Sequence, residues 1–247
     1  MKKKLFIIAA IAGMVLVGCK KKIEEPYVLT MTTAVSGEYK LYITGTGTAT
    51  IDWGDGSSDH VTLSNLPADL KDLWDYFFTH IYASAGVKTI KVTGNVLSLD
   101  TDWTGEITDL DVSKMPALKV LLCGNEKLTL LDVSENTALT VLYCNFNNLT
   151  SLNVSKNTAL TKLYCYGNNL TTLTLGTHNA LTELYCNDNY LGKENLVDIF
   201  NKLPTRMPAD DARIYCGGGF YPNPGYSLLT PTDIQIATDK NWTVGDR

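Results

Sequence analysis

Residues 118–123 read LKVLLC, and the same pattern returns as LTVLYC at 139–144, LTKLYC at 160–165 and LTELYC at 181–186. Successive copies start 21 residues apart, and a second pattern, LDVS at 110–113, repeats in phase with the first. A fixed period in the twenties is typical of a solenoid, in which each coil buries its apolar edge by stacking on its neighbours. The sequence therefore predicts four stacked coils over about residues 107–191.

The whole repeat, L-x-x-L-x-C-x-x-N-x-L-x-x-L-D-V-S, resembles the short bacterial type of leucine-rich repeat. The resemblance implies that Leu, Val and Cys point inward while alternate strand positions point outward. It also implies an inward asparagine ladder that satisfies backbone groups at the turns, formed by Asn147, Asn168 and Asn189. Glu126 takes that place in the first coil. His178 replaces the asparagine of the second half-repeat, and we interpret it as a turn residue and not as a catalyst.

Four cysteines keep the same period of 21: Cys123, Cys144, Cys165 and Cys186. Cys216 is predicted to form a fifth rung after a longer connection. Disulfides form in extracytoplasmic proteins, but side chains in one column of parallel strands point the same way, which favours stacked buried thiols over bridges. The column contains no C-x-x-C pair, so no metal site is predicted there.

Residues 27–99 read as a small β-domain. Alternating β-branched and aromatic residues predict strands at 39–44, 48–53 and 87–93, separated by glycine-rich turns. Residues 66–78 carry apolar side chains at helical spacing, which predicts a helical insertion before the third strand.

The run Ile51-Asp52-Trp53-Gly54-Asp55-Gly56, with a later His80-Ile81-Tyr82, resembles a PKD-like domain. That resemblance implies an immunoglobulin-type β-sandwich with a WGDG turn. Asp52, Asp55 and Asp59 leave a calcium loop open as an alternative. Because Asp and Gly are also what a tight turn favours, we expect a turn without metal, and packing or turn roles for His60 and His80.

The first residues indicate an export signal. Three lysines at 2–4 precede an apolar run at 5–17, which is the pattern of a secretory signal peptide and is short for a membrane span. The run ends in Leu16-Val17-Gly18-Cys19, which resembles the bacterial lipobox. The resemblance implies cleavage before Cys19 and acyl chains, such as palmitate, on that residue. The alternative is an ordinary signal peptide with an incidental cysteine.

Residues 19–26 read as a short charged tether. Part of it, Lys22-Ile23-Glu24-Glu25, resembles the acidic export tags of surface lipoproteins in the Bacteroidetes. Three lysines directly after Cys19 depart from that pattern. We expect an outer-membrane lipoprotein at the cell surface, with a periplasmic orientation as the alternative.

The last 55 residues are predicted to cap the solenoid. Leu196, Ile199, Phe200 and Leu203 follow helical spacing, and Pro204 ends that element. Thr230-Pro231-Thr232-Asp233 has the pattern of a capping box at the start of a second helix. A solenoid needs such a cover for the apolar edge of its last coil.

Composition excludes several classes of function. The chain has 247 residues, 45% of them hydrophobic and 19% charged, with a net charge of −5 and three histidines. A mildly acidic protein lacks the basic surface of a nucleic-acid binder. The few histidines argue against a His-built metal site, and no cofactor fingerprint or catalytic signature is present. We therefore expect no cofactor, no metal and no enzyme activity.

The outward strand column predicts a contiguous aromatic stripe formed by Tyr143, Tyr164, Tyr185 and Tyr215. Leu122 precedes these residues in the column, and Val141, Lys162, Glu183, Asn145, Tyr166 and Asn187 are expected to flank it. Neighbouring coils lie about 4.8 Å apart, so the rings would touch. Tyrosines among amides and charges suit the recognition of a protein or a glycan. The simplest alternative is that tyrosine stabilises strands.

These observations predict a mainly β chain. It has a signal peptide at 1–18, a tether at 19–26, a small PKD-like or immunoglobulin-like β-sandwich at 27–99, and a leucine-rich repeat solenoid with a helical C-terminal cap at 100–247. The predicted function is that of a membrane-anchored binding protein that reads a protein or a glycan with the solenoid. The alternative is a periplasm-facing structural component of the envelope, and the oligomeric state is left open.

Overall fold

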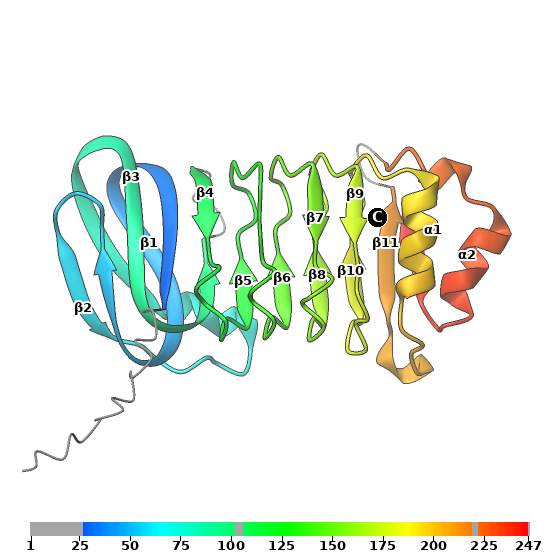
Figure 1. Cartoon of the computed structure of the whole chain (residues 1–247), viewed down its shortest axis with the longest axis horizontal. Helices are drawn as coiled ribbons and strands as arrows, with labels where there is room; N and C mark the ends of the chain where they lie inside the picture. Colours follow the sequence, from blue (N-terminus) through cyan, green and yellow to red (C-terminus); the bar gives the residue numbers. More distant parts are fainter. Residues whose placement is uncertain (1–26, 102–105, 219–221, 247) are drawn as a thin grey trace, which may run out of the picture.

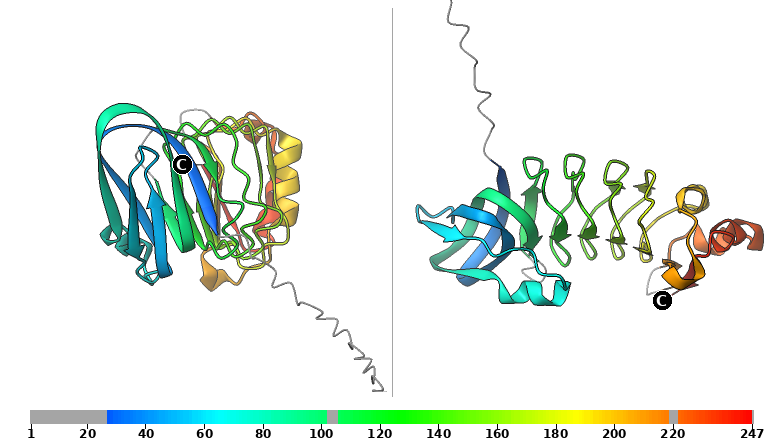
Figure 2. Two further views of the ribbon diagram at one scale, coloured as in Figure 1. Left: turned by 60° about the vertical axis from the view of Figure 1, so that its left-hand side comes forward. Right: turned by 90° about the horizontal axis from the view of Figure 1, so that it is seen from below.

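The computed structural model describes residues 27–101, 106–218 and 222–246. It is an elongated molecule, with a β-domain at one end, a row of stacked coils in the middle and a helical cap at the other end (Figure 1). Figure 2 shows the coils side by side between the two end units.

Two long strands, β1 (Val28–Asp52) and β3 (Phe77–Asp100), form most of the N-terminal domain, with the short β2 (Ser58–Thr62) at its edge. They pair antiparallel with several register shifts, and Lys91 pairs with both Thr30 and Asp52. The strand pair therefore curls back on itself and encloses a core that includes Trp53 and Ile90.

Two details of this domain differ from the prediction. The strands expected at 39–44 and 48–53 belong to one strand, because the glycines between them form irregularities within β1 and do not end it. The expected helical insertion at 66–78 contains only a six-residue 3-10 helix, η1 (Leu70–Asp75). Phe77 and Phe78 already belong to β3, since they pair with Tyr42 and Leu41.

The predicted coils form a parallel ladder of short strands: β5 (Val120–Leu122), β6 (Val141–Tyr143), β8 (Lys162–Tyr164) and β10 (Glu183–Tyr185). Every rung places leucine at its central position, and Leu121, Leu142, Leu163 and Leu184 have no exposed surface. The register keeps equivalent residues side by side. In β8 and β10 the residues on either side of this leucine are partly exposed, so the expected inward and outward alternation is confirmed there.

The β-domain and the solenoid share one sheet. Residues 98–100 at the end of β3 pair in parallel with β5, and β4 (Ile107–Asp111) pairs with β1. One continuous hydrophobic core runs from Leu29 in β1 to Trp242 near the end of the chain. The first coil thus stacks directly on the N-terminal domain.

The second half of the coils carries the short strands β7 (Ser151–Asn153) and β9 (Thr172–Thr174). The expected asparagine ladder closes the turns. Asn147 Oδ1 accepts from the Leu128 amide at 2.9 Å, and its Nδ2 donates to the Cys123 carbonyl at 2.8 Å. Asn168 and Asn189 repeat this geometry, and Glu126 accepts from the Ile107 amide in the first coil.

The C-terminal cap adds two more rungs and two helices. Its elements are α1 (Lys193–Lys202), η2 (Pro208–Asp210), β11 (Arg213–Gly217), η3 (Tyr226–Leu228), α2 (Pro231–Thr238) and β12 (Thr243–Asp246). The predicted fifth rung is β11, which places Cys216 in the buried column. The capping box of α2 is present between Thr230 and Asp233. The sixth rung, β12, was not predicted.

Candidate recognition face

Four tyrosines form a continuous row on the outward face of the ladder, as the register predicts. We call this set, Tyr143, Tyr164, Tyr185 and Tyr215, the tyrosine ladder. The Tyr143 and Tyr164 rings stack at 4.1 Å with an interplanar angle of 1°, and the Tyr164 and Tyr185 rings at 4.3 Å and 4°. Tyr215 meets Tyr185 edge to face at 4.6 Å. Both faces of the Tyr164 ring are therefore covered, and ring edges and hydroxyl groups remain for contact.

An ion pair crosses the middle of this face. Lys162 Nζ lies 2.6 Å from Glu183 Oε1, and the Tyr164 hydroxyl donates to Glu183 Oε2. Burial acts to raise the pKa of Glu183, but hydrogen bonds from Lys162 and Tyr164 hold it below its usual value. Burial and the bond to Glu183 raise the pKa of Tyr164. At neutral pH the face thus presents a fixed carboxylate and a protonated phenol.

A segment of the N-terminal domain covers one end of the face. We call residues 66–75 the strap. Its Leu73 is 2% exposed and packs with Val120, Leu122 and Val141, whose side chains leave the outward side of β5 and β6. Leu122 and Val141, expected in or beside an exposed stripe, are therefore buried. Uncovered tyrosines begin at Tyr143, which itself packs against this small cluster.

The other end of the face is closed by the cap. Tyr215 lies over Gly245 of β12, where a Cβ atom would come within 3.0 Å of the ring. A hollow of about 220 Å³ lies beside Tyr185, lined by Thr182, Glu183, Tyr185, Asp210, Asp211 and Arg213. Its rim charges are paired, because Arg213 contacts Asp211 and Arg206 contacts Asp210. The accessible face thus extends over β6, β8, β10 and β11.

On one side of the tyrosine ladder, the exposed residues differ from those that the sequence predicts. Asn145 and Asn187 are 6% and 3% exposed, so they contribute little surface. Tyr166 remains accessible, and next to it lies Phe146, a residue that the sequence reading missed. The signal was present, because Phe146 stands in a turn column that otherwise holds Asn125, Gly167 and Asp188, all types that tolerate a left-handed backbone.

The predicted cysteine column is present and buried. The column consists of reduced thiols without exposed surface: Cys123, Cys144, Cys165, Cys186 and Cys216. Burial and the neighbouring cysteines raise the pKa of Cys165 well above its ordinary value. A thiol of this kind is a core residue with little nucleophilic character at neutral pH.

The aspartates of the WGDG turn are engaged in the turn itself. Asp55 accepts from the Ser57 hydroxyl at 2.6 Å, from His80 Nε2 at 2.8 Å and from the Ser57 amide at 3.0 Å, and these bonds lower its pKa. Asp59 accepts from Trp53 Nε1 at 2.8 Å, and the His80 ring stacks on Trp53 at 4.9 Å. These contacts make His80 a packing residue, as expected.

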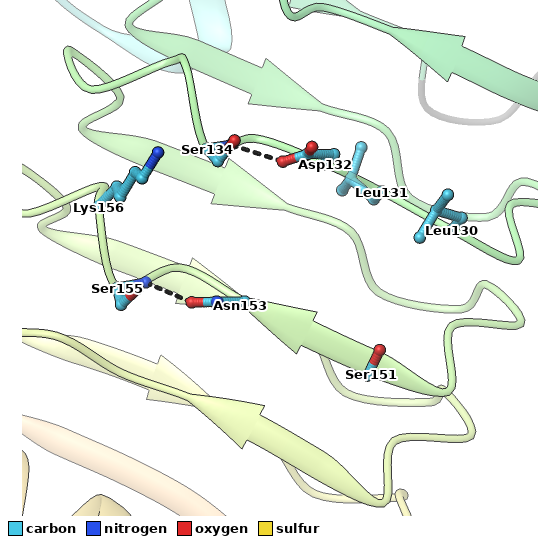
Figure 3. A pocket seen from close by; sticks show the side chains of 8 residues that line it. All are labelled: Leu130, Leu131, Asp132, Ser134, Ser151, Asn153, Ser155 and Lys156. Atoms are coloured by element: carbon cyan, nitrogen blue, oxygen red, sulfur yellow. Dashed lines mark hydrogen bonds between the residues drawn. The ribbon is translucent and has the colours of Figure 1, made fainter.

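A second hollow lies on the other half of the coils. It has a volume of about 250 Å³, and Figure 3 shows its lining residues Leu130, Leu131, Asp132, Ser134, Ser151, Asn153, Ser155 and Lys156. Asp132 and Asn153 accept from the Ser134 and Ser155 amides, so their polar atoms serve the local turns. The hollow marks a gap between two coils and presents no cluster of reactive groups.

Two further findings concern the described residues only. Within 27–101, 106–218 and 222–246, no group of three or more His, Cys, Asp or Glu side chains is placed to hold a metal ion. No helix in that part of the chain is long and apolar enough to cross a membrane. Cys19 lies outside it, so the lipid anchor stays a prediction.

Comparisons with known proteins add a limited likeness. No family model and no curated protein matches the chain. The functional domain of InlJ from Listeria monocytogenes, described as including a cysteine ladder, is 31% identical over 53% of this chain, with a TM-score of 0.36. The internalin InlF from the same organism is 15% identical over 60%, with a TM-score of 0.38.

Those matches span 30% and 46% of the InlJ and InlF chains, less than half of either. At these TM-scores neither superposition carries an argument about function. The class of fold follows from the chain's own geometry, which is a mainly β protein with a β-solenoid of the leucine-rich repeat type.

Proposed function

We propose that this protein is a non-catalytic binding protein that is anchored in the outer membrane by a lipid on Cys19 and recognises a protein partner at the cell surface. In this proposal the N-terminal domain is PKD-like and the tyrosine ladder is the recognition surface. The observation that carries it is the row of stacked, partly exposed tyrosines on one face of the sheet. Tyrosine is enriched in protein interfaces, because it buries a large ring while its hydroxyl keeps a hydrogen bond.

Ring geometry favours a protein over a glycan as the partner. A sugar packs its C–H groups on the open, electron-rich face of an aromatic ring. Tyr164 has a neighbouring ring on each face, at 4.1 and 4.3 Å. What the ladder offers instead are ring edges and hydroxyls beside the Lys162–Glu183 pair. Such a surface matches the mixed apolar and polar groups of another protein.

The reactive residue types support a non-catalytic role. The thiols of the cysteine column are buried, and burial raises the pKa of Cys165 and Cys186. His178 is 1% exposed and accepts from the Gly176 amide at 3.1 Å, as a turn residue does. A nucleophile and its base need mutual contact and access to substrate, which these groups lack.

A peptide selection tests the recognition face. Short random peptides displayed on phage would be selected on the full chain in detergent, alongside a glycan array. We expect selected peptides to lose at least about tenfold in affinity for the Y164A/Y185A variant, because central aromatic residues dominate interface energies. The matched control is Leu130→Ala, an exposed apolar residue on the other half of the coils. Equal binding by Y164A/Y185A and wild type would contradict the proposal.

The proposed cell-surface orientation of the protein has one alternative, which a specific observation supports. Lys20, Lys21 and Lys22 directly follow Cys19, which departs from the acidic export tags of surface lipoproteins. The alternative is therefore a periplasm-facing component of the envelope that contacts other envelope proteins. Protease treatment of intact cells, with antibody detection of the solenoid, separates the two. We expect loss of the signal without lysis, whereas protection until lysis would support the periplasmic role.

A further inference from the structure

The turn column after the cysteines holds the chain in a left-handed backbone at every coil. The φ angles of Asn125, Phe146 and Asp188 are 56°, 51° and 50°, and that of Gly167 is 67°. Asn, Asp and Gly adopt this conformation readily, but a bulky aromatic residue there is strained. Strained residues of this kind cluster at binding sites, where the surrounding fold holds them in place.

The strained residue carries an accessible ring. Phe146 is 50% exposed, more than any other phenylalanine in the described part of the chain. It rests on Gly167, where a Cβ atom would come within 2.5 Å of the ring, so the next coil leaves room for it. The second coil therefore has a strained backbone at a residue whose aromatic side chain is half exposed.

Phe146 is continuous with the tyrosine ladder. Its ring meets Tyr166 edge to face at 5.0 Å, with an interplanar angle of 78°, and Tyr166 lies 6.5 Å from Tyr164. The Phe146–Tyr166 pair therefore extends the aromatic surface from the strands round the edge of the coils. Because Phe146 is half exposed, part of its surface is available to a further apolar group.

We infer that Phe146 and Tyr166 form a second binding element, a rim that receives an apolar side chain of the same protein partner. This inference rests on the proposed function, because the partner is the one held by the tyrosine ladder. The ladder supplies edges and hydroxyls, and the rim supplies an apolar platform beside them. A partner that contacts both is held at two points set at an angle, which fixes its orientation on the solenoid.

The peptides selected on the full chain test this rim. The variant Phe146→Asn keeps a residue that suits the left-handed turn, as Asn125 does in the first coil, and removes only the ring. We expect affinity to fall at least about tenfold while the melting temperature stays equal or rises, because strain is relieved. Phe146→Trp should keep most of the affinity.

Combining F146N with substitutions in a selected peptide identifies the apolar side chain that contacts the rim. Replacing the apolar residues of a selected peptide by alanine, one at a time, should reveal one position whose loss makes wild type and F146N bind alike. Binding of F146N within about twofold of wild type would overturn the inference. Selection of no peptide at all would count against it as well. If F146N binds like wild type while Y164A/Y185A does not, the inference about the rim is wrong and the proposed function is still supported.

Discussion

At the scale of single residues, the fourth coil departs from the others at two positions that compensate each other. In three coils an Asp or Asn side chain accepts from the amide two residues later, as Asp132 does from Ser134 at 2.9 Å. The fourth coil has Thr174 there, whose hydroxyl is a weaker acceptor for this turn than an Asp or Asn side chain. His178 Nε2 takes the Gly176 amide instead, at 3.1 Å. His178 thus occupies the inward position that asparagine holds in the two preceding coils, and it also accepts the hydrogen bond from the Gly176 amide.

This exchange predicts coupling between Thr174 and His178. With His178 present, Thr174→Asp should change the free energy of unfolding little, because the Gly176 amide is already bonded. In the His178→Asn background the same change should raise the free energy of unfolding by about 1 kcal/mol, since it restores an acceptor to the half-buried Gly176 amide. Urea denaturation of the four proteins measures the difference. Equal effects of Thr174→Asp in both backgrounds would show that the two sites are independent.

The same residue gives the fold a pH dependence. Burial lowers the pKa of His178 from its ordinary 6.5, so the unfolded chain binds the proton more readily than the folded one. Stability contributed by neutral His178 is therefore present above pH 6.5 and declines as the pH falls below that value. Urea denaturation should therefore show a smaller loss of stability in H178N than in wild type as the pH falls from neutral to just below 6.5.

At the scale of elements, the strap defines where the candidate recognition face begins. It lies over β5 and β6 because Leu73 fills a small apolar cluster with Val120, Leu122 and Val141. Leu73→Ala should lower the free energy of unfolding by about 2 kcal/mol, near the low end for a buried leucine, since a short segment can partly relax. Ile81→Ala, on a side chain 72% exposed, is the matched control. If the two variants unfold at the same urea concentration, the strap contributes nothing to stability.

Elements that recur were predictable, and elements that occur once were not. The period of 21 fixed the rungs, the buried Leu and Cys columns and the tyrosine ladder, because each column samples the same environment several times. The strap and β12 have no second copy in the sequence. Residues 66–78 matched helical spacing, yet the pairing of Phe78 with Leu41 made their end a strand. The cover over Leu122 joins segments about fifty residues apart, a contact that no local pattern encodes.

At the scale of the whole molecule, the N-terminal domain acts as the first layer of the solenoid. Residues 98–100 pair with β5, β4 pairs with β1, and one core crosses the junction. Each coil buries its apolar edge only against a neighbour, so the first coil depends on this domain as the last coil depends on the cap. The tyrosine ladder and the N-terminal domain therefore belong to one continuous sheet.

Removing residues 27–96 should consequently prevent the solenoid from folding alone. The first coil would expose Leu118, Leu121 and Cys123, which have no exposed surface in the whole chain. We expect loss of the cooperative thermal transition in circular dichroism and self-association in size-exclusion chromatography. The matched control deletes residues 139–159, one full repeat of 21, which brings two equivalent coils into contact and leaves both ends covered. That shortened protein should remain a folded monomer with lower stability, because fewer interfaces between coils remain. If the protein without residues 27–96 is cooperative and monomeric, the N-terminal domain is a spacer joined to an independent solenoid.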